Sequence, residues 1–174
     1  MHPVPARAAP LIEFDFGDPV HVLDCKQLAQ RKSPMVVVVG PQTYRRVEMQ
    51  LQGAIESFVI MFQPDGLHRL FSIPMHELTD KDCEGHSLLG AFISQLQTCL
   101  GGCKSLEERA RCADGFLSRR AMDSRSYGGI SAAVNRIVLA GGRIETAALA
   151  DHAGLSMRQF ERRFCEQVGI APKQ

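Results

Sequence analysis

The sequence has no long apolar run, no export signal and no closely spaced pair of cysteines. Its longest apolar run, residues 35–39 (MVVVV), has the length of a strand, whereas a membrane-spanning helix needs about 20 apolar residues. The opening residues, MHPVPARAAP, lack the apolar core of an export signal. The sequence therefore predicts a cytoplasmic chain without a membrane partner.

The cysteines form none of the C-x-x-C pairs that bind structural zinc or carry dithiol chemistry. The closest two, Cys99 and Cys103, flank a pair of glycines, and glycine disfavours the helix that would place both thiols on one face. We therefore expect reduced, mostly packed thiols at all six positions, which are Cys25, Cys83, Cys99, Cys103, Cys112 and Cys165.

Motifs for catalysis are absent as well. The chain contains no phosphate-binding G-x-x-x-x-G-K-[ST] or G-x-G-x-x-G motif and no G-x-S-x-G elbow. The residue pair His76–Glu77 and the triplet Glu84-x-His86 are interpreted as surface residues at helix ends. Four of the six histidines, His21, His68, His76 and His86, form none of the H-x-H or H-x-x-x-H pairs that bind metals. We expect no enzyme, no metal and no cofactor.

Short apolar runs and alternations fill residues 11–73 and predict strands. They are LIEFDF, HVLDC, MVVVVG, YRRVEMQL and ESFVIMF, separated by turn signals such as GDP, RKSP and QPDG. This pattern is typical of an antiparallel β-sandwich or barrel.

From residue 64 onward the apolar residues recur three and four apart, which predicts helices within residues 66–78, 88–100 and 105–120. Ser105 and Glu108 have the spacing of a capping box at the start of the third. The polar stretch MDSRSYGG, residues 122–129, is predicted to be a linker. Three more helices are expected at about 130–139, 145–153 and 156–168, each ended by glycine. The predicted fold class is α+β.

The stretch ALADHAGLSMRQFERRF, residues 148–164, predicts a turn between the last two helices. Gly154 is expected to adopt the left-handed conformation that ends a helix, with Leu155 turning inward. Ser156 and Gln159 have the spacing of a capping box for the next helix. Phe160 and Phe164 lie one turn apart and are predicted to be buried on the same face as Leu155.

The opposite face of that last helix is predicted to be exposed and suited to DNA. Two arginines one turn apart, Arg158 and Arg162, can each bind guanine bidentately, and Glu161 can accept from a cytosine amino group. Arg163 and the free amides at the helix start suit phosphate. The predicted DNA-binding residues are Ser156, Met157, Arg158, Gln159, Glu161, Arg162 and Arg163, and Gln167 is also expected to point away from the core.

The alternative on spacing alone is a solvated helix hairpin in which Arg158, Glu161 and Arg162 form intrahelical ion pairs. The charge balance favours neither interpretation strongly. Residues 1–129 carry 14 Lys and Arg against 15 Asp and Glu, a net charge of −1, and residues 130–174 carry 6 against 4, a net charge of +2.

The segment GGRIETAALADHAGLSMRQFERRFCEQVGIAPKQ resembles the first helix-turn-helix of the AraC/XylS family of bacterial transcription regulators. The family pattern L-A-x-x-x-G-x-S-x-R-x-(F/L)-x-R-x-F followed by V-G-x-x-P-K is matched by Leu149, Ala150, Gly154, Ser156, Arg158, Phe160, Arg162, Phe164, Gly169, Pro172 and Lys173. The resemblance implies sequence-specific binding to promoter DNA, with the helix from Ser156 to Val168 in the major groove.

The segments LIEFDFGDP, VVVVGPQT and FVIMFQPDGLHRLFSIPMHELTD are similar, less specifically, to the cupin-like sensory domain that precedes such modules. The resemblance implies a sensory domain over residues 1–129, with a helical connector from about 76 to 129, and a partial DNA-binding domain over residues 130–174. The family's second helix-turn-helix, the joining helix and the first sensory strands are expected to be missing.

The resemblance also allows a homodimer and a small-molecule effector. Residues able to line an effector pocket are Phe14, Phe16, Phe58, Val59 and Phe62, although such alternating strand residues are more often plain core. The competing function is an effector-binding or dimerisation module whose truncated helix-turn-helix does not bind DNA on its own.

Overall fold

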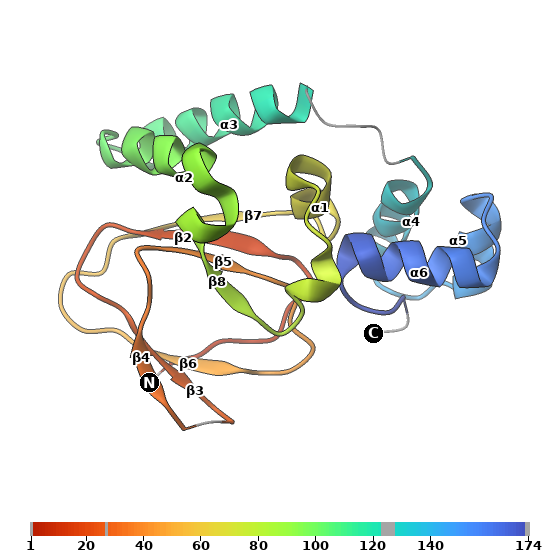
Figure 1. The fold of residues 1–174 in the computed structure, drawn as a ribbon, viewed down its shortest axis with the longest axis horizontal. Coiled ribbons are helices and arrows are strands. Elements are labelled where there is room, and N and C mark those ends of the chain that lie inside the picture. Colours follow the sequence, from red (N-terminus) through yellow and green to blue (C-terminus); the bar gives the residue numbers. More distant parts are fainter. Residues whose placement is uncertain (1, 27, 123–127, 173–174) are drawn as a thin grey trace.

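The computed structural model describes residues 2–26, 28–122 and 128–172, and it has a mixed α/β architecture. Two antiparallel four-stranded sheets form the N-terminal part, residues 2–122, together with helices α1 to α3. A separate group of three helices, the α4–α6 group (residues 128–172), lies beside α1 at one end of the sheets (Figure 1). The observed strands and helices agree with the α+β class predicted.

The first sheet has the strand order β1-β6-β3-β4 and the second has the order β7-β2-β5-β8. The first contains β1 (His2–Pro3), β3 (His21–Asp24), β4 (Gln30–Lys32) and β6 (Val47–Gln50). The second contains β2 (Leu11–Asp15), β5 (Val36–Val39), β7 (Ser57–Met61) and β8 (Asp82–Glu84).

Five of these strands, β2, β3, β5, β6 and β7, lie within the runs from which they were predicted. Strands β1, β4 and β8 were not predicted, and β8 lies in a region expected to be helical. All three are two or three residues long, stand at sheet edges and carry polar residues, so they show no apolar alternation. They can be identified only from their backbone pairing with a neighbouring strand in the folded structure.

The second sheet supplies the main core through one of its faces. Ile12 and Phe14 of β2, and Val36 and Val38 of β5, are fully buried on that face because alternate strand residues point the same way. Helices α2 (Gly85–Gly101) and α3 (Leu106–Met122) cover this face, and the first sheet lies on the other side (Figure 1). The sandwich is therefore a three-layer arrangement of helices, sheet and sheet.

Residues 66–78 form two short elements instead of the single helix predicted. Helix α1 (Gly66–Phe71) ends at Ser72, whose φ of 56° lies in the left-handed region. Pro74 then precedes the 3-10 turn η1 (Met75–Glu77). The correction has a physical reason: proline lacks the amide hydrogen that a continuing helix would need, and it disfavours helical backbone in the residue before it.

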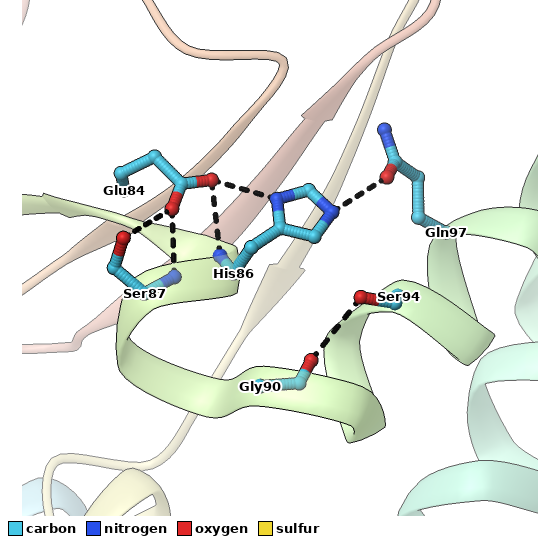
Figure 2. A network of polar contacts seen from close by, with 6 residues as sticks. All are labelled: Glu84, His86, Ser87, Gly90, Ser94 and Gln97. Carbon is cyan, nitrogen blue, oxygen red and sulfur yellow. Dashed lines mark hydrogen bonds and ion pairs between the residues drawn. The ribbon is translucent and has the colours of Figure 1, made fainter.

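A carboxylate caps the start of α2, as Figure 2 shows. Glu84 accepts hydrogen bonds from the amides of His86, at 3.0 Å, and Ser87, at 2.7 Å. The His86 ring contacts Glu84 Oε1 through Nδ1, at 2.6 Å, and Gln97 Oε1 through Nε2, at 2.9 Å. The hydrogen bond from the His86 side chain is the main reason that the pKa of Glu84 falls to about 2, and the same bond raises the pKa of His86. Both residues lie at a helix end, as predicted.

His86 also bridges an interruption in α2. Gly90 has φ 55° and ψ −134°, a conformation that side-chain-bearing residues rarely adopt, and it lies between His86 and Gln97 in the chain. The imidazole thus joins the residues before and after the kink (Figure 2).

The expectation of six reduced thiols is wrong for two of them. Cys99 of α2 and Cys112 of α3 form a disulfide, with their Cα atoms 6.7 Å apart. Helix α2 ends at Gly101, with Gly102 as its C-cap, so Cys103 lies outside the helix, as the two glycines led us to expect. The sequence separation of 13 could not reveal the bond, because it depends on how α2 packs against α3.

The predicted capping box before α3 is only half formed. The amide of Glu108 donates to Ser105 Oγ at 3.2 Å, but the Glu108 carboxylate accepts from the amide of Lys104, at 2.7 Å, instead of that of Ser105.

The α4–α6 group has its own apolar core. It contains α4 (Gly128–Leu139), α5 (Thr146–His152) and α6 (Met157–Val168). Each helix ends near glycine with positive φ, as predicted: 59° and 79° at Gly141 and Gly142, 65° at Gly154 and 90° at Gly169. Most of the predicted linker, residues 123–127, lies outside the described residues. Over the part of the chain that is described, no helix is long and apolar enough to cross a membrane.

Candidate nucleic-acid interface

The turn that leads into α6 is closed by backbone hydrogen bonds. The amide of Leu155 donates to the carbonyl of Ala150 at 3.0 Å, and that of Gly154 donates to Asp151 at 3.0 Å. This pair of bonds is the Schellman arrangement, which needs a left-handed residue such as Gly154 at the position after the helix cap. The predicted role of Gly154 is confirmed.

The start of α6 is held by the predicted capping box. Ser156 Oγ accepts from the amide of Gln159 at 3.4 Å, and Gln159 Oε1 accepts from the amide of Ser156 at 3.2 Å. Ser156 Oγ also lies 3.1 Å from Gln159 Oε1. These bonds satisfy only some of the free amides in the first turn, so the remainder can meet an anion.

One face of α6 anchors it to α4 and α5. Phe160 is fully buried and Phe164 is 4% exposed, with ring centroids 5.6 Å apart. They pack with Leu149 and Ala150 of α5 and with Val134 of α4, among others. Leu155 is half-buried against the same cluster. The predicted burial of this face is therefore correct.

The opposite face of α6 is open to solvent. All of the residues predicted to bind DNA are exposed, namely Ser156, Met157, Arg158, Gln159, Glu161, Arg162 and Arg163. Four of them line one open hollow of about 400 Å³: Ser156, Arg158, Gln159 and Arg162. The two arginines therefore share one surface, where both guanidinium groups can reach a single ligand.

Arg163 faces a different surface. It lines a second hollow, of about 210 Å³, with Gly128 and Gly129 of α4 and with Ala153 and Leu155 of the turn. Gln167 lines this same hollow and does not point away from the core as predicted, since its Oε1 atom is buried and has no hydrogen-bond partner among the described residues. A residue at this position lies over the junction with α4, which helical spacing within α6 alone cannot show.

The charged side chains of the exposed face remain available to a ligand. With the described residues, neither Arg158, Glu161 nor Arg162 forms an ion pair. An arginine fork that is free of an intramolecular carboxylate can donate two parallel hydrogen bonds to a planar acceptor such as a phosphate or a guanine edge. The geometry thus differs from the ion-paired hairpin that was the alternative.

The far end of α6 is attached to the N-terminal part. Thr79 Oγ1 donates to the carbonyl of Gly169 at 2.6 Å, and a β-carbon at Gly169 would lie only 2.6 Å from Pro41 Cγ and 2.8 Å from the Met75 carbonyl oxygen. A second contact joins Ser131 of α4 to the buried carboxylate of Asp65. These seam contacts involve Ser131 of α4 and Gly169 at the C-terminal end of α6, whereas the predicted DNA-binding residues lie between Ser156 and Arg163.

The residues suggested for an effector pocket do not form one. Phe14, Phe58 and Phe62 are core, Phe16 is half-buried against it, and Val59 is 42% exposed. None of the five lines any of the cavities described here. Phe14, Phe16, Phe58 and Phe62 belong to the core under the helices or pack against it. Val59 pairs with Glu13 and therefore lies on the other face of the sheet.

A small cavity of about 50 Å³ lies instead between the two sheets, lined by charged as well as apolar residues. Burial is the main reason that the pKa of Glu13 rises to about 7, with the charge of Asp15 adding to it and that of Arg7 opposing it. Nearby, Asp82 pairs with Arg31 and, at 3.0 Å, with Arg46. A cavity of this volume has room for no more than a few water molecules.

This inter-sheet cluster was not recognised from the sequence. The available signal was the pattern LIEFDF, in which Glu13 and Asp15 alternate with buried residues and would ordinarily be placed on a solvent face. No group of three or more His, Cys, Asp or Glu side chains suited to a metal ion occurs in residues 2–26, 28–122 and 128–172.

Residues 5–84 match a family described as a domain of unknown function, DUF6597. No curated protein matches the chain.

Among solved structures, the chain is similar to ToxT from Vibrio cholerae, with 12% identity, a TM-score of 0.37, and coverage of 98% of this chain and 91% of that chain. For ToxT bound to (E)-4-(8-methylnaphthalen-1-yl)but-3-enoic acid the identity is 10%, the TM-score 0.32 and the coverage 98% and 92%. For wild-type ToxT with an unsaturated fatty acid bound the values are 11%, 0.26, 98% and 87%. TM-scores this low do not extend the likeness to function.

Proposed function

We propose that this chain is a sequence-specific DNA-binding transcription regulator of the AraC/XylS type, in which α6 enters the major groove. Residues 1–129 form a cupin-like sensory domain with a helical connector from about 76, and residues 130–174 form a helix-turn-helix domain. Regulation of this kind takes place in the cytoplasm.

One observation carries the proposal. Three residues of the family pattern have the local environment that a helix-turn-helix needs: Gly154 takes the left-handed turn, Ser156 caps α6, and Phe160 is buried. Arg158 and Arg162 are exposed on one surface, and neither forms an ion pair with any residue that the structure describes. The last residue of the pattern, Lys173, lies outside the described residues. A solvated helix hairpin does not require this combination of turn, cap, buried phenylalanine and exposed arginines, whereas a helix-turn-helix does.

Base recognition is assigned to the shared surface of Arg158 and Arg162. Each can donate bidentately to O6 and N7 of guanine, and Glu161 can accept from N4 of cytosine. Gln159 uses its side-chain oxygen in the capping box, so its amino group remains to donate to a base. Met157 can make apolar contact with a thymine methyl group.

Phosphate contacts are assigned to Arg163 and to the amides at the start of α6 near Ser156. Arg163 lines a different hollow from Arg158 and Arg162, so it can reach the backbone while they reach the bases. The positive end of the helix dipole adds to the attraction for phosphate.

Selection from a random DNA library, followed by titrations of the selected duplex at several salt concentrations, tests the function. A monomer with a single recognition helix is expected to bind in the range of about 10⁻⁴–10⁻⁶ M, because specific affinities of roughly 10⁻⁸–10⁻¹¹ M need a larger interface or a dimer. Adding a second helix-turn-helix of the family type should tighten binding to a site with two halves one helical turn apart. A library that returns no enriched sequence, with affinity independent of salt, would support the effector-binding or dimerisation module instead.

Two arginine variants should separate reading of bases from attraction to the backbone. Arg162→Ala is expected to cost about 1–3 kcal/mol on the selected site and to relax the preference at one base position. Arg163→Ala is expected to weaken binding to all duplexes and to lower the salt slope by about one. Arg111→Ala in α3, also an exposed arginine, serves as the control and should change neither. An unchanged selected motif for Arg162→Ala contradicts the role given to Arg162.

A further inference from the structure

Three of the six cysteines lie together where α2 ends and α3 begins. Cys99 of α2 is bonded to Cys112 of α3, and Cys103, between the two helices, donates a hydrogen bond through Sγ to the carbonyl of Cys99 at 3.3 Å. All three residues are half-buried and so keep part of their surface in solvent. This thiol cluster (Cys99, Cys103 and Cys112) therefore combines a disulfide with a third sulfur beside it.

Helix α3 has few other attachments to the N-terminal part. Of its 17 residues only Ala113 is fully buried, and Cys112, Phe116 and Leu117 pack against the main core while partly exposed. A helix in a protein is stabilised mainly by packing of its apolar face, and this face is narrow in α3. The disulfide joins residues 13 apart in the chain and so restricts the positions open to α3 when it leaves the sheet.

The proposed function places the chain in a reducing environment. A DNA-binding regulator works in the cytoplasm, where disulfides are usually transient and often sense redox conditions. A half-buried disulfide with a neighbouring thiol suits such a role, because thiol–disulfide exchange needs a thiolate that can reach one of the two bonded sulfurs. The expectation of a reducing environment rests on the proposed function, whereas the thiol chemistry does not.

We propose that the thiol cluster is a reversible redox site that reacts with small disulfides of the glutathione class and thereby fastens or releases α3. On oxidation, one cysteine thiolate attacks the small disulfide, which forms a mixed disulfide and releases one small thiol. The other cysteine then attacks the mixed disulfide, which forms the Cys99–Cys112 bond and releases the second small thiol. The two cysteines lose two electrons and two protons, and the small disulfide gains them.

Cys103 is the thiol placed to open the bond from within the chain. Its sulfur lies against the backbone of Cys99, so its thiolate can attack Sγ of Cys99 and expel Cys112 as a thiolate. The new bond joins Cys99 to Cys103, and both of these residues precede α3. This internal step needs no external reactant and leaves α3 without its covalent link to α2.

Release of α3 is expected to reach the α4–α6 group through α1. The Nε atom of Arg120 in α3 donates to the carbonyl of Leu70 in α1 at 2.8 Å, and its guanidinium lies over the ring of Phe71, 5.5 Å from the centroid. Helix α1 packs against α6 as well as against α3. The state of the disulfide therefore bears on how firmly α6 is held against the N-terminal part.

Alkylation of the full chain after equilibration in glutathione buffers tests the site without any DNA. The chain is equilibrated at several ratios of reduced to oxidised glutathione, quenched with acid, alkylated and mapped by mass spectrometry. In mildly oxidising buffer we expect the four free cysteines, Cys25, Cys83, Cys103 and Cys165, to be labelled, and in reducing buffer all six. A bond that stays closed in excess reduced glutathione overturns the reversible site, and so does a bond that never forms.

Hydrogen exchange of backbone amides measures the release of α3. In the reduced chain the amides of α3 should exchange roughly 10²-fold faster, because closing a loop of this length restricts the undocked states by about that factor. Those of α1 should also exchange faster, whereas those of β3 and β6 in the first sheet should keep their protection. Equal protection of α3 in the two redox states overturns the proposal.

Cysteine variants assign the two roles within the thiol cluster. Cys112→Ser and Cys99→Ser cannot form the bond, so α3 in both should exchange its amides as in the reduced wild type, whatever the buffer. Cys103→Ser keeps the bond and should slow its reduction by at least about tenfold. Cys25→Ser, at a half-buried free cysteine, is the control and should change neither result.

Thermal unfolding of each variant shows whether it is folded, and the two single variants of the bonded pair check each other. An unchanged rate of reduction in Cys103→Ser contradicts the role given to Cys103. Amides of α3 that stay protected in folded Cys112→Ser and Cys99→Ser contradict the fastening of α3 by the bond. Absence of DNA binding would leave all of these measurements unaffected, so this proposal and the proposed function fail separately.

Discussion

Phe160→Ala is expected to unfold the α4–α6 group while the sheets remain folded. Phe160 is fully buried at the centre of the second core, and truncating a buried phenylalanine costs about 3–5 kcal/mol through lost burial and the cavity left behind. A core of eight buried residues has little more stability than that to lose. DNA binding, which needs α6 held in place, should disappear with it.

Hydrogen exchange of backbone amides resolves this local effect. Amides of α4 and α6 should exchange roughly 10²–10⁴-fold faster in the variant, whereas those of β2 and β5 in the other core should keep their protection. Leu139→Ala, at a leucine of α4 that is 87% exposed, is the matched control and should change exchange little. Unchanged protection of α6 in Phe160→Ala would show that Phe160 does not hold the group together.

Glu13→Gln is expected to make the chain more stable at pH 8 and to leave its stability at pH 4.5 nearly unchanged. Burial between the sheets raises the pKa of Glu13 from 4.5 to about 7 in the folded chain, so folding favours the protonated form. The stability that this carboxyl contributes is complete below pH 4.5 and is lost as the pH rises through 7. The difference amounts to the order of 3 kcal/mol, and glutamine removes it by staying neutral.

Urea unfolding of the wild type and the variant at pH 4.5, 6 and 8 measures the effect. The wild type should lose stability over this interval, and the variant should lose less. A smaller slope remains in both, because burial also raises the pKa of Asp15. Glu77→Gln, at an exposed glutamate of η1, should keep the wild-type slope. If the stability of wild type and of Glu13→Gln changed equally with pH, folding would not raise the pKa of Glu13.

Local signals in the chain sufficed for the elements around the candidate interface. Glycine after each of the last three helices, the Ser156 and Gln159 capping box and the spacing of Phe160 and Phe164 all depend on residues within one or two turns of each other. Interactions between residues this close in the chain can be predicted from the sequence alone. The same holds for the five longer strands, whose alternation reports a buried and an exposed side.

Contacts between distant segments could not be predicted in this way. The disulfide between Cys99 and Cys112 depends on the packing of α2 against α3, and the edge strands β4 and β8 depend on the strands beside them. The direction of Gln167 depends on the approach of α4. None of these features produces a periodic pattern in the sequence, because each depends on a contact with a segment that is distant in the chain.

The sequence by itself determined a β-rich N-terminal part, a helical C-terminal part, and a capped amphipathic helix with arginines on its exposed face. Only the tertiary structure decided that Arg158 and Arg162 form no ion pair with the described residues, that Glu13 is half-buried between two sheets, and that Gly169 lies against Pro41, Met75 and Thr79. Propensity and periodicity act over a few residues, whereas burial, charge environment and the seam between the two parts arise when distant segments come into contact, such as Thr79 and Gly169, which are 90 residues apart.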